Sequence, residues 1–415
     1  MNEKRDIYWG WFIVLGAFLI LSMNYGTRYC FGIFVKPMSL EYHWSRSVIS
    51  IAASINILLY AIGGILSGYL LDRMAPKWIM TIGGIIAATG FILAGFVKMP
   101  WQFYLVYGVL CGAGSAGIGV VVSSSYVGKW FVKKRGVAIG ITSMGIGFGT
   151  MVLTPVVGYI VKIYGWQNGF MFLGMMVFII VVLLSQLLMG KTKPEAYGLL
   201  PDGEEAVEVV SGTAAVTDVP SMSLVPVLAD SRFWILVICF GIAIMAEMLA
   251  FVHQVAYALE NNIGKVVAAS SLGVIGTASI FGRFFFGWLS DHLKDVKYSA
   301  SLGFLFMAAG MFILCKTDTA KLLFLYAIVF GFGYGSLAPM MPVLVADRFG
   351  RHILGSAYGM LTFFVAGVGG GLGPILGGII YDRLGSYIYA WQFNLIILII
   401  VAFLMLTLKP RADGY

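Results

Sequence analysis

The sequence predicts an all-α membrane protein of twelve transmembrane helices, arranged as two six-helix halves related by pseudo-symmetry. Three observations carry this prediction: an excess of apolar residues, twelve apolar segments, and an internal repeat. Hydrophobic residues make up 60% of the 415 residues and charged residues 11%, whereas a soluble domain has about 25% charged residues. Mean hydropathy is +0.92. We therefore expect a polytopic protein of the lipid bilayer rather than a soluble enzyme.

Each of the twelve apolar segments is long enough to cross a hydrocarbon core of roughly 30 Å as a helix. They are residues 8–35, 48–71, 78–97, 101–127, 136–162, 167–190, 232–258, 266–290, 297–315, 320–345, 353–380 and 387–408. A polar stretch rich in Glu, Gly, Ser, Thr and Pro separates the first six from the last six. We expect an N-terminal bundle at 1–190, a cytoplasmic linker at 191–231 and a C-terminal bundle at 232–415.

The two halves repeat one another at a constant offset of 219 residues. The offset relates acidic, proline and glycine positions across four spans. The pairs are Asp72 and Asp291, Pro155 and Pro374, Gly68 and Gly287, Gly114 and Gly333, Gly136 and Gly355, Gly140 and Gly359, and Gly158 and Gly377. Two parallel six-helix repeats predict a transporter with its site at the midplane between them.

The formal net charge of +8 arises from basic residues at the ends of the apolar segments. They therefore indicate topology rather than a nucleic-acid surface. With both termini inside, 17 of the 27 lysines and arginines lie inside and two lie within spans. The eight outside are Lys36, Arg46, Lys98, Lys162, Lys265, Lys316, Lys321 and Arg383. This bias predicts a multi-pass protein of the plasma or inner membrane, with cytoplasmic termini and linker.

No pattern for catalysis or cofactor binding stands out. The four cysteines, Cys30, Cys111, Cys239 and Cys315, lie in or at the ends of apolar runs without disulfide or metal spacing. No nucleophile–base pair or metal-ligand cluster occurs in a water-accessible loop. We expect no enzyme activity, no catalytic residue, no metal and no cofactor.

One arginine stands alone in the apolar segment 266–290. Arg283 lies eight residues before Asp291, which places it about 12 Å inside the membrane at 1.5 Å per residue. A charge at that depth costs about 2.5–3.5 kcal/mol or more. Arg283 either pairs permanently with a buried acid or binds an anionic substrate. We favour the substrate, because no acidic residue lies within one helical turn.

The loop Gly68–Lys77 and its repeat partner Gly287–Lys294 resemble the Gly-x-x-x-Asp-Arg loop of major facilitator transporters. Asp72 and Asp291 are predicted to gate the inner side by pairing with a basic residue or a helix N-terminus. The alternative is an ordinary charged loop. The stretches Asp6–Phe18 and Lys129–Ile141 are similar to the paired signatures of the monocarboxylate transporter family. That resemblance covers the twelve spans and implies proton-linked transport of lactate, pyruvate and similar monoanions.

The resemblance carries over residue by residue. Arg283 matches the eighth-span arginine that holds the substrate carboxylate. Ser279 stands where the family often has a proton-coupling aspartate, and Tyr29 stands at its first-span lysine. The oxalate/formate antiporters, which the chain also resembles, have a second cation in the eleventh span. This chain has none between Ile353 and Ile380. A monocarboxylate therefore fits better than a dianion, because one arginine forms one bidentate carboxylate pair.

Four other polar residues of the spans are candidates for the site or its gating. Tyr334 could donate to the carboxylate or simply pack among glycines. His253 could gate, donate to the substrate or carry the proton, or be an ordinary hydrogen-bonded residue. The repeat offset places Glu247 opposite Arg28. These two could form a salt bridge that opens and closes with the outer gate, or a static pair.

Three apolar positions correspond to pocket linings in the family: Phe31, Val122 and Phe148. They are predicted to line one wall of the site, and the alternative for each is lipid exposure or core packing. Taken together, the sequence predicts a monomeric, proton-coupled symporter of small monocarboxylates such as L-lactate or pyruvate, working by alternating access. The alternative is an organic anion antiporter of the oxalate/formate type.

Overall fold

The computed structural model describes residues 8–190, 193–197, 199–203 and 224–410, and these form helices without any β-strand. Within these described ranges, eleven helical segments are long and apolar enough to cross a membrane. The twelfth span is residues 354–384, where α17 (Leu354–Phe364), the π-helix η5 (Val365–Gly369) and α18 (Gly370–Leu384) run on from one another. The predicted all-α fold of twelve membrane helices is confirmed.

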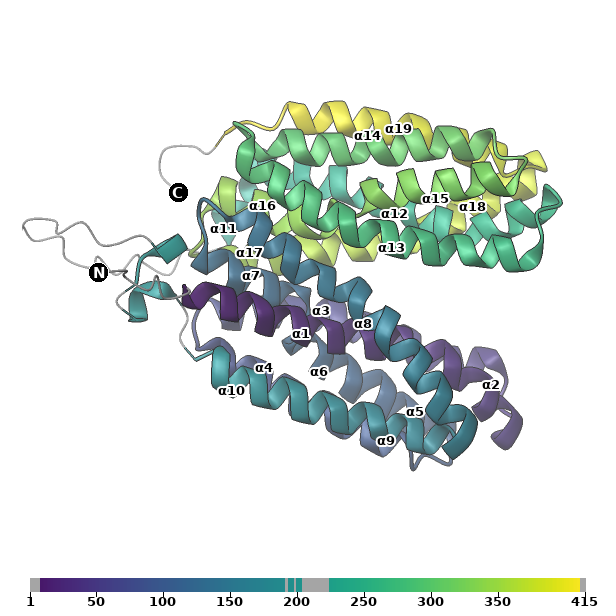
Figure 1. Cartoon of the computed structure of the whole chain (residues 1–415), viewed down its shortest axis with the longest axis horizontal. Coiled ribbons are helices and arrows are strands. Elements are labelled where there is room, and N and C mark those ends of the chain that lie inside the picture. The colour runs from purple at the N-terminus through teal and green to yellow at the C-terminus, as the bar shows by residue number, and fades with distance from the viewer. Residues whose placement is uncertain (1–7, 191–192, 198, 204–223, 411–415) are drawn as a thin grey trace, which may run out of the picture.

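The N-terminal group of helices supplies the first six spans (Figure 1). Several spans are divided by a kink or a π-helical turn, and two short 3₁₀ helices follow the sixth. The elements are α1 (Trp9–Tyr29), α2 (Phe31–Tyr42), α3 (Arg46–Leu71), α4 (Pro76–Ala94), α5 (Pro100–Phe103), η1 (Tyr104–Cys111), α6 (Gly112–Gly117), α7 (Val120–Trp130), α8 (Arg135–Tyr164), α9 (Trp166–Val177), η2 (Phe178–Val182), α10 (Leu183–Leu188), η3 (Pro194–Tyr197) and η4 (Pro201–Gly203).

The C-terminal group supplies the other six spans. Before α17 it consists of α11 (Val225–Ala229), α12 (Ser231–Glu260), α13 (Lys265–His292), α14 (Val296–Cys315), α15 (Ala320–Tyr334) and α16 (Leu337–Phe349), and after α18 of α19 (Ile388–Leu406). The fourth and tenth spans break at nearly equivalent positions of the repeat, after Gly117 and after Tyr334. Such breaks are tolerated in a membrane where neighbouring helices satisfy the freed backbone groups.

Two pairs of helices make the most extensive contacts between the groups. α8 packs on α13, and α3 packs on α17, so the second span meets the eleventh and the fifth meets the eighth. Glycines allow this approach: a methyl group on Gly287 would lie 3.1 Å from the Gly140 Cα and would collide with the Gly136 carbonyl. Small residues drive close helix packing in lipid, where burial of apolar area gives no advantage.

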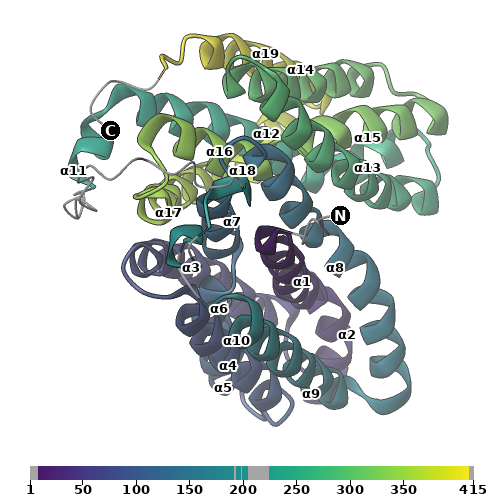
Figure 2. The ribbon, with the colours of Figure 1, turned by 60° about the vertical axis from the view of Figure 1, so that its left-hand side comes forward.

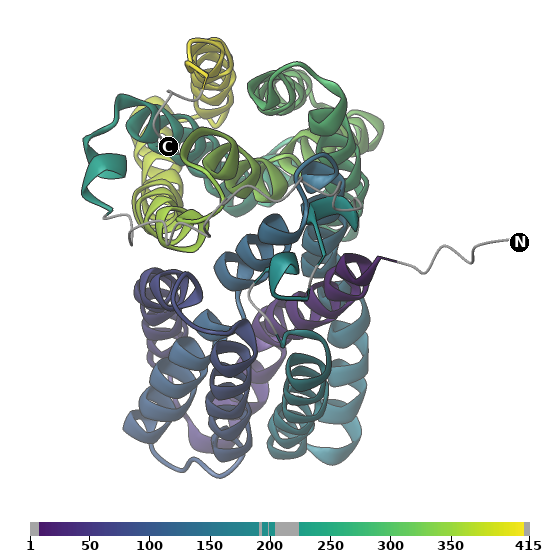
Figure 3. The same cartoon turned by 90° about the vertical axis from the view of Figure 1, so that its left-hand side faces the viewer.

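The two groups converge at one end and diverge at the other. Both described ends of the chain lie at the converging end, and α2 and α18 reach towards the diverging end (Figure 1). Figure 2 shows α13 and α8 crossing between the groups, and Figure 3 views the converging end. We call this converging end the gate end. Much of the predicted linker 191–231 lies outside the described residues, so the boundaries 1–190 and 232–415 stay predictions.

Candidate functional site

A cavity of about 960 Å³ lies between the two groups of helices. Its wall is largely apolar and comes from α1, α8, α12, α13 and α15. Residues of the wall include Tyr29, Ile146, Gly147, Thr150, Phe251, Ser279, Ile280, Arg283, Ile328 and Tyr334. Arg283 is the one charged residue among the described residues that line it. The cavity thus has the size and the apolar character of a small-molecule site with few polar anchors.

The Arg283 guanidinium is 3% exposed but is not neutralised by a carboxylate. Nη1 donates to the Ser143 carbonyl at 3.3 Å, and Nη2 lies 3.5 Å from the Tyr334 hydroxyl. Nε has no hydrogen-bond partner in the described structure. Over the described ranges, no acidic oxygen lies within the 4 Å of an ion pair with Arg283. A buried guanidinium without an ion-pair partner within the described residues favours the binding of an anion.

Close packing around Arg283 fixes the backbone from which it projects. A methyl group on Gly335 would lie 2.6 Å from the Ser279 carbonyl oxygen and 2.8 Å from the Arg283 amide nitrogen. α13 and α15 can therefore touch at this level only with glycine at position 335. Ser279 Oγ donates to the Gly276 carbonyl at 2.7 Å, so its hydroxyl proton is used within α13. Ser279 shapes the wall rather than supplying a free donor.

Tyr334 and Glu247 form the rest of the polar cluster. The Tyr334 ring packs edge-on against Phe251, with centroids 5.5 Å apart. Glu247 is 4% exposed, and its carboxyl neighbours both the Tyr334 hydroxyl and the Arg283 guanidinium. The three side chains come from α12, α13 and α15, so the cluster arises only when the C-terminal group is assembled.

His253 lies outside the wall of the cavity. Its Nε2 is 2.9 Å from the Pro374 carbonyl oxygen and its Nδ1 is 3.4 Å from the Tyr387 hydroxyl, so the ring packs towards α18 and α19. His253 follows Glu247 by six residues, which is one full helical turn plus about 240° at 3.6 residues per turn. The two side chains therefore point to different sides of α12. Phe251, four residues after Glu247, lies in the wall of the cavity instead of His253.

The three predicted apolar wall residues also lie elsewhere. Phe31 stacks on Tyr107 with centroids 4.9 Å apart, Val122 is fully buried, and Phe148 packs against Phe18. None of the three belongs to the lining of the cavity. On α8 the lining falls on Ile146, Gly147 and Thr150, because successive helical residues point about 100° apart.

Arg28 and Glu247 are not paired in this arrangement. The Arg28 guanidinium lies 4.2 Å from the centre of the Tyr60 ring, a cation–π contact between α1 and α3. In the described part of the chain no ion pair joins Arg28 to Glu247. Tyr29, the next residue, is 55% exposed and lines the cavity. The predicted salt bridge stays a prediction for another arrangement of the halves.

At the gate end, Asp72 joins α3 to the start of α17. Its carboxylate accepts from the Ser356 amide and hydroxyl, both at 2.7 Å, and from the Gly355 amide at 3.1 Å. The Lys129 ammonium also lies 2.8 Å from it. Negative charge at a helix N-terminus is favoured by the helix dipole and by its unsatisfied amides.

Asp291 makes the equivalent contact from the C-terminal group to the N-terminal group. Its carboxylate accepts from the Gly136 amide at 2.7 Å and the Val137 amide at 2.8 Å, at the start of α8. The offset of 219 that relates Asp72 to Asp291 also relates Gly355 to Gly136. Each group of helices thus caps a helix of the other, and together the two contacts join the groups at the gate end.

The short 3₁₀ helices after the sixth span also hold the gate end. Asp202 accepts from three consecutive amides, those of Val132 and Lys133 at 2.9 Å and Lys134 at 3.0 Å. Glu195 forms an ion pair with Arg351, which precedes α17. We call these two contacts the linker latch, because they tie this segment to both groups of helices. In the sequence, Asp202 and Glu195 indicated only that the linker is polar.

Among the residues that the structure describes, no three histidine, cysteine, aspartate or glutamate side chains gather as metal ligands. Sequence reasoning identified Arg283, Ser279 and Tyr334 in the wall and did not select Ile146, Gly147, Phe251 or Ile280. Phe251 carried a usable signal, since it lies one helical turn from Glu247. The α8 residues carried none, because they depend on which face of that helix turns towards α13.

Comparison with known proteins gives consistent results. The sequence model of the Major Facilitator Superfamily matches residues 17–370 and 297–414. Monocarboxylate transporter 12 of Homo sapiens is 27% identical over 94% of this chain and 78% of that protein. Monocarboxylate transporter 12-B of Danio rerio is 28% identical (91% and 82%), and monocarboxylate transporter 2 of Homo sapiens is 24% identical (94% and 84%).

Two solved structures show the same fold. The proton:xylose symporter XylE, bound to 6-bromo-6-deoxy-D-glucose, superposes with a TM-score of 0.73 at 15% identity, covering 97% of this chain and 96% of that one. The transporter FucP in the outward conformation also gives 0.73, at 14% identity and 96% and 98% coverage. At these identities the similarity concerns the fold.

Proposed function

The chain belongs to the major facilitator superfamily, and we propose that this transporter moves small monocarboxylates such as L-lactate or pyruvate together with a proton. One observation supports this most directly: the buried Arg283 guanidinium meets the central cavity without a carboxylate partner in the described structure. Its relatives named monocarboxylate transporters agree with a carboxylate substrate.

In the proposed complex, Arg283 holds the substrate carboxylate and Tyr334 adds a hydroxyl donor. The planar guanidinium forms two parallel N–H···O bonds to a carboxylate, a geometry that lysine lacks. Ile146, Ile280 and Phe251 surround this end of the cavity with apolar surface, which suits a short alkyl tail. Ser279, Phe31, Val122, Phe148 and His253 remain proposed contributors for arrangements in which the halves have moved.

A single negative charge matches the cavity better than two. The described wall contains one cation, Arg283, and the eleventh span contains no lysine or arginine between Ile353 and Ile380. A second carboxylate would be desolvated without a partner, which is costly. This favours a monocarboxylate symporter over the oxalate/formate type of antiporter.

We assign the proton to Glu247, with His253 as the alternative. Glu247 is buried beside Arg283 and Tyr334, so its charge and that of an arriving anion would compete for the same guanidinium. Protonating Glu247 frees Arg283 for the substrate and couples the two binding events. Both ring nitrogens of His253 already face oxygen atoms of Pro374 and Tyr387, which favours a structural role.

Alternating access follows from the energetic state of the arginine. When the cavity is open, water solvates Arg283; when it closes, an unpaired buried cation is costly. A bound monoanion removes that cost, so the loaded transporter crosses more readily than an empty one in which Glu247 is protonated and Arg283 has no anion beside it. Asp72 and Asp291 then release α17 and α8, and Arg28 meets Glu247 as the opposite end closes.

We further propose that the protein works as a monomer in the plasma or inner membrane, with its termini, linker and gate end in the cytoplasm. The distribution of lysines and arginines supports this orientation. The two bundles 1–190 and 232–415 then rock about the cavity as bodies joined by the linker 191–231.

The test is uptake by the purified chain in proteoliposomes, with a panel of C1–C6 mono- and dicarboxylates and with or without a proton gradient. We expect saturable uptake of lactate or pyruvate, driven by an inward proton gradient. Uptake that needs a counter-anion inside the vesicle and ignores the gradient would instead establish the antiporter. Absence of carboxylate flux under both conditions would refute the carboxylate assignment.

A further inference from the structure

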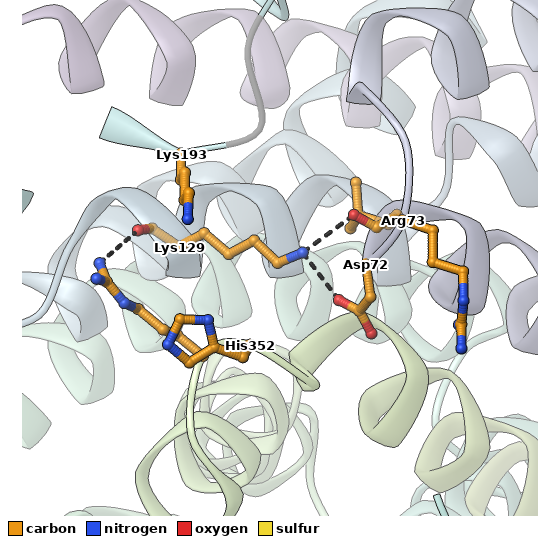
Figure 4. Close-up of a pocket in the computed structure, with 7 residues that line it drawn as sticks. Asp72, Arg73, Lys129, Lys193 and His352 are labelled. Atoms are coloured by element: carbon orange, nitrogen blue, oxygen red, sulfur yellow. Dashed lines mark hydrogen bonds and ion pairs between the residues drawn. The ribbon is translucent and has the colours of Figure 1, made fainter. Parts of the chain in front are cut away.

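A second, smaller cavity lies at the gate end, outside the central cavity. It encloses about 200 Å³, and its lining is dominated by basic side chains. They come from α3 (Arg73), α7 (Lys129), the segment after the sixth span (Lys193) and the turn before α17 (Arg351 and His352). Figure 4 shows Lys193 and His352 on opposite sides of the Lys129 side chain.

Three of these basic groups already have partners. The Lys129 ammonium donates to Asp72 at 2.8 Å and to the Leu71 carbonyl at 3.0 Å. Arg351 pairs with Glu195. The Arg73 side chain points away from Lys129 (Figure 4), and its guanidinium stacks on the Tyr69 ring at 3.5 Å. In the part of the chain that the structure describes, no ion pair involves Lys193 or His352.

The cavity is therefore electropositive. Four permanent cations line it, and the acids Asp72 and Glu195 offset two of them. The electrostatic environment at His352 agrees: partial burial and the nearby charges of Arg351, Lys193 and Lys129 lower the pKa of this histidine below its usual value, while Glu195 raises it. A site of this kind attracts a multiply charged anion.

We propose that this cavity binds a phosphate-type anion, with Lys193, His352 and Arg351 as its ligands. Phosphate carries up to two negative charges near neutral pH and takes charge-assisted hydrogen bonds from several donors at once. Lys193 and His352 are exposed, so the anion can enter without moving a helix. The phosphate can be free in solution or belong to the headgroup of an anionic lipid, because the site follows directly on the sixth span.

Binding there would favour one arrangement of the transporter. The ligands belong to the linker segment and to the C-terminal group, and Lys129 and Asp72 of the N-terminal group complete the wall. The site is whole only while α3 and α17 meet. A ligand that prefers one state shifts the population towards it, so phosphate would hold the gate end closed and slow turnover.

The first measurement is calorimetric titration of the purified full-length chain with inorganic phosphate at low ionic strength. We expect saturable binding to one site, weakened about tenfold or more in Lys193→Gln/His352→Gln, as expected for a loss of about 1.4 kcal/mol or more. Lys321→Gln, at the opposite end of the molecule, is the matched control and should bind as the parent does. Neither substituted residue belongs to the central cavity.

The second measurement separates the two sources of phosphate. The chain in phosphatidylcholine nanodiscs is compared with the chain in nanodiscs containing phosphatidic acid, with and without free phosphate. Saturable calorimetric binding in phosphatidylcholine supports a soluble anion. Phosphatidic acid that raises the unfolding temperature of the parent, but not of Lys193→Gln/His352→Gln, supports a lipid headgroup.

Folding of the double variant is checked by its gel-filtration profile. If the double variant does not fold, Lys193→Gln alone replaces it in both measurements. Histidine NMR of the parent provides an independent readout, since a bound phosphate should raise the pKa of His352. The proposal is overturned if neither source binds saturably, or if Lys321→Gln weakens binding as much as Lys193→Gln does.

Discussion

The guanidinium of Arg283 and the hydroxyl of Tyr334 lie 3.5 Å apart at the junction of α13 and α15, on the wall of the central cavity. Arg283 also reaches the Ser143 carbonyl of α8 at 3.3 Å. A single side chain thus contacts both groups of helices and the cavity between them. An anion bound to Arg283, as proposed, would therefore act directly on the interface between the two groups.

Replacing Arg283 by lysine should abolish most lactate uptake while leaving insertion intact. Lysine keeps the charge but loses the two parallel N–H donors, each worth about 1.5–3 kcal/mol to a charged partner, so we expect uptake to fall about 10- to 100-fold or more. Initial rates in proteoliposomes measure this. Arg383→Lys, exposed in the last turn of α18, is the control, and normal uptake by Arg283→Lys would remove Arg283 from the site.

Replacing Glu247 by glutamine should uncouple transport from the proton. Glutamine mimics the protonated carboxyl, so lactate should still exchange for lactate, but a proton gradient should no longer drive accumulation. The pH profile of exchange should flatten, because the competing carboxylate is gone. Glu260→Gln, exposed at the end of the same helix, should behave as the parent does.

His253→Ala distinguishes the two proton candidates. If Glu247 carries the proton, this variant keeps gradient-driven uptake and its pH profile. A flattened profile in His253→Ala, together with an unchanged profile in Glu247→Gln, would transfer the assignment to the histidine.

Asp291→Asn should weaken the closed gate end. The carboxylate accepts from two amides at the start of α8, and losing its charge at a helix N-terminus costs about 0.3–2 kcal/mol. The ratio of gate-closed to gate-open molecules should fall about 2- to 30-fold. Distances between spin labels at positions 98 and 316, in the diverging loops of a cysteine-free variant, should shorten.

The matched control is Asp382→Asn, which removes a carboxylate from an exposed position at the diverging end. Its label distances should equal those of the parent. Unchanged distances in Asp291→Asn would show that this cap does not hold the gate.

Asp202→Ala should release the loop between α7 and α8. Asp202 is the acceptor for three successive amides of exposed residues, and a hydrogen bond to a charged acceptor contributes on the order of 1–3 kcal/mol. Hydrogen exchange at Val132, Lys133 and Lys134 should accelerate about 5- to 100-fold. Asp318→Ala, exposed at the diverging end, should leave these amides unaffected; equal protection in both variants would rule out the linker latch.

Two residues of the cavity wall could be predicted from local chemistry alone. An arginine deep in an apolar run is costly wherever it lies, so Arg283 had to face protein or a wet cavity. Tyr334 was predicted because its polar hydroxyl occurs among glycines in the middle of the tenth span. Both line the cavity, whereas their roles in binding remain proposals that the variants above test.

Other positions could not be predicted because they depend on helix rotation. His253 and Glu247 are six residues apart on α12, yet one faces α18 and the other neighbours Arg283. Phe148 and Gly147 are adjacent on α8, yet only Gly147 lines the cavity. A shift of one residue turns a helix by about 100°, and apolar residues all round a membrane helix leave that angle undetermined.

The order of residues was enough to establish the number of spans, the repeat and the single arginine of the eighth span, because lipid penalises polar groups in a way that depends on local composition. The tertiary structure was needed to show that Asp72 and Asp291 cap helices of the opposite group, that Asp202 holds three loop amides, and that Arg283 has no ion-pair partner within the described residues. These contacts join residues 68 or more positions apart, and their geometry depends on how the helices pack.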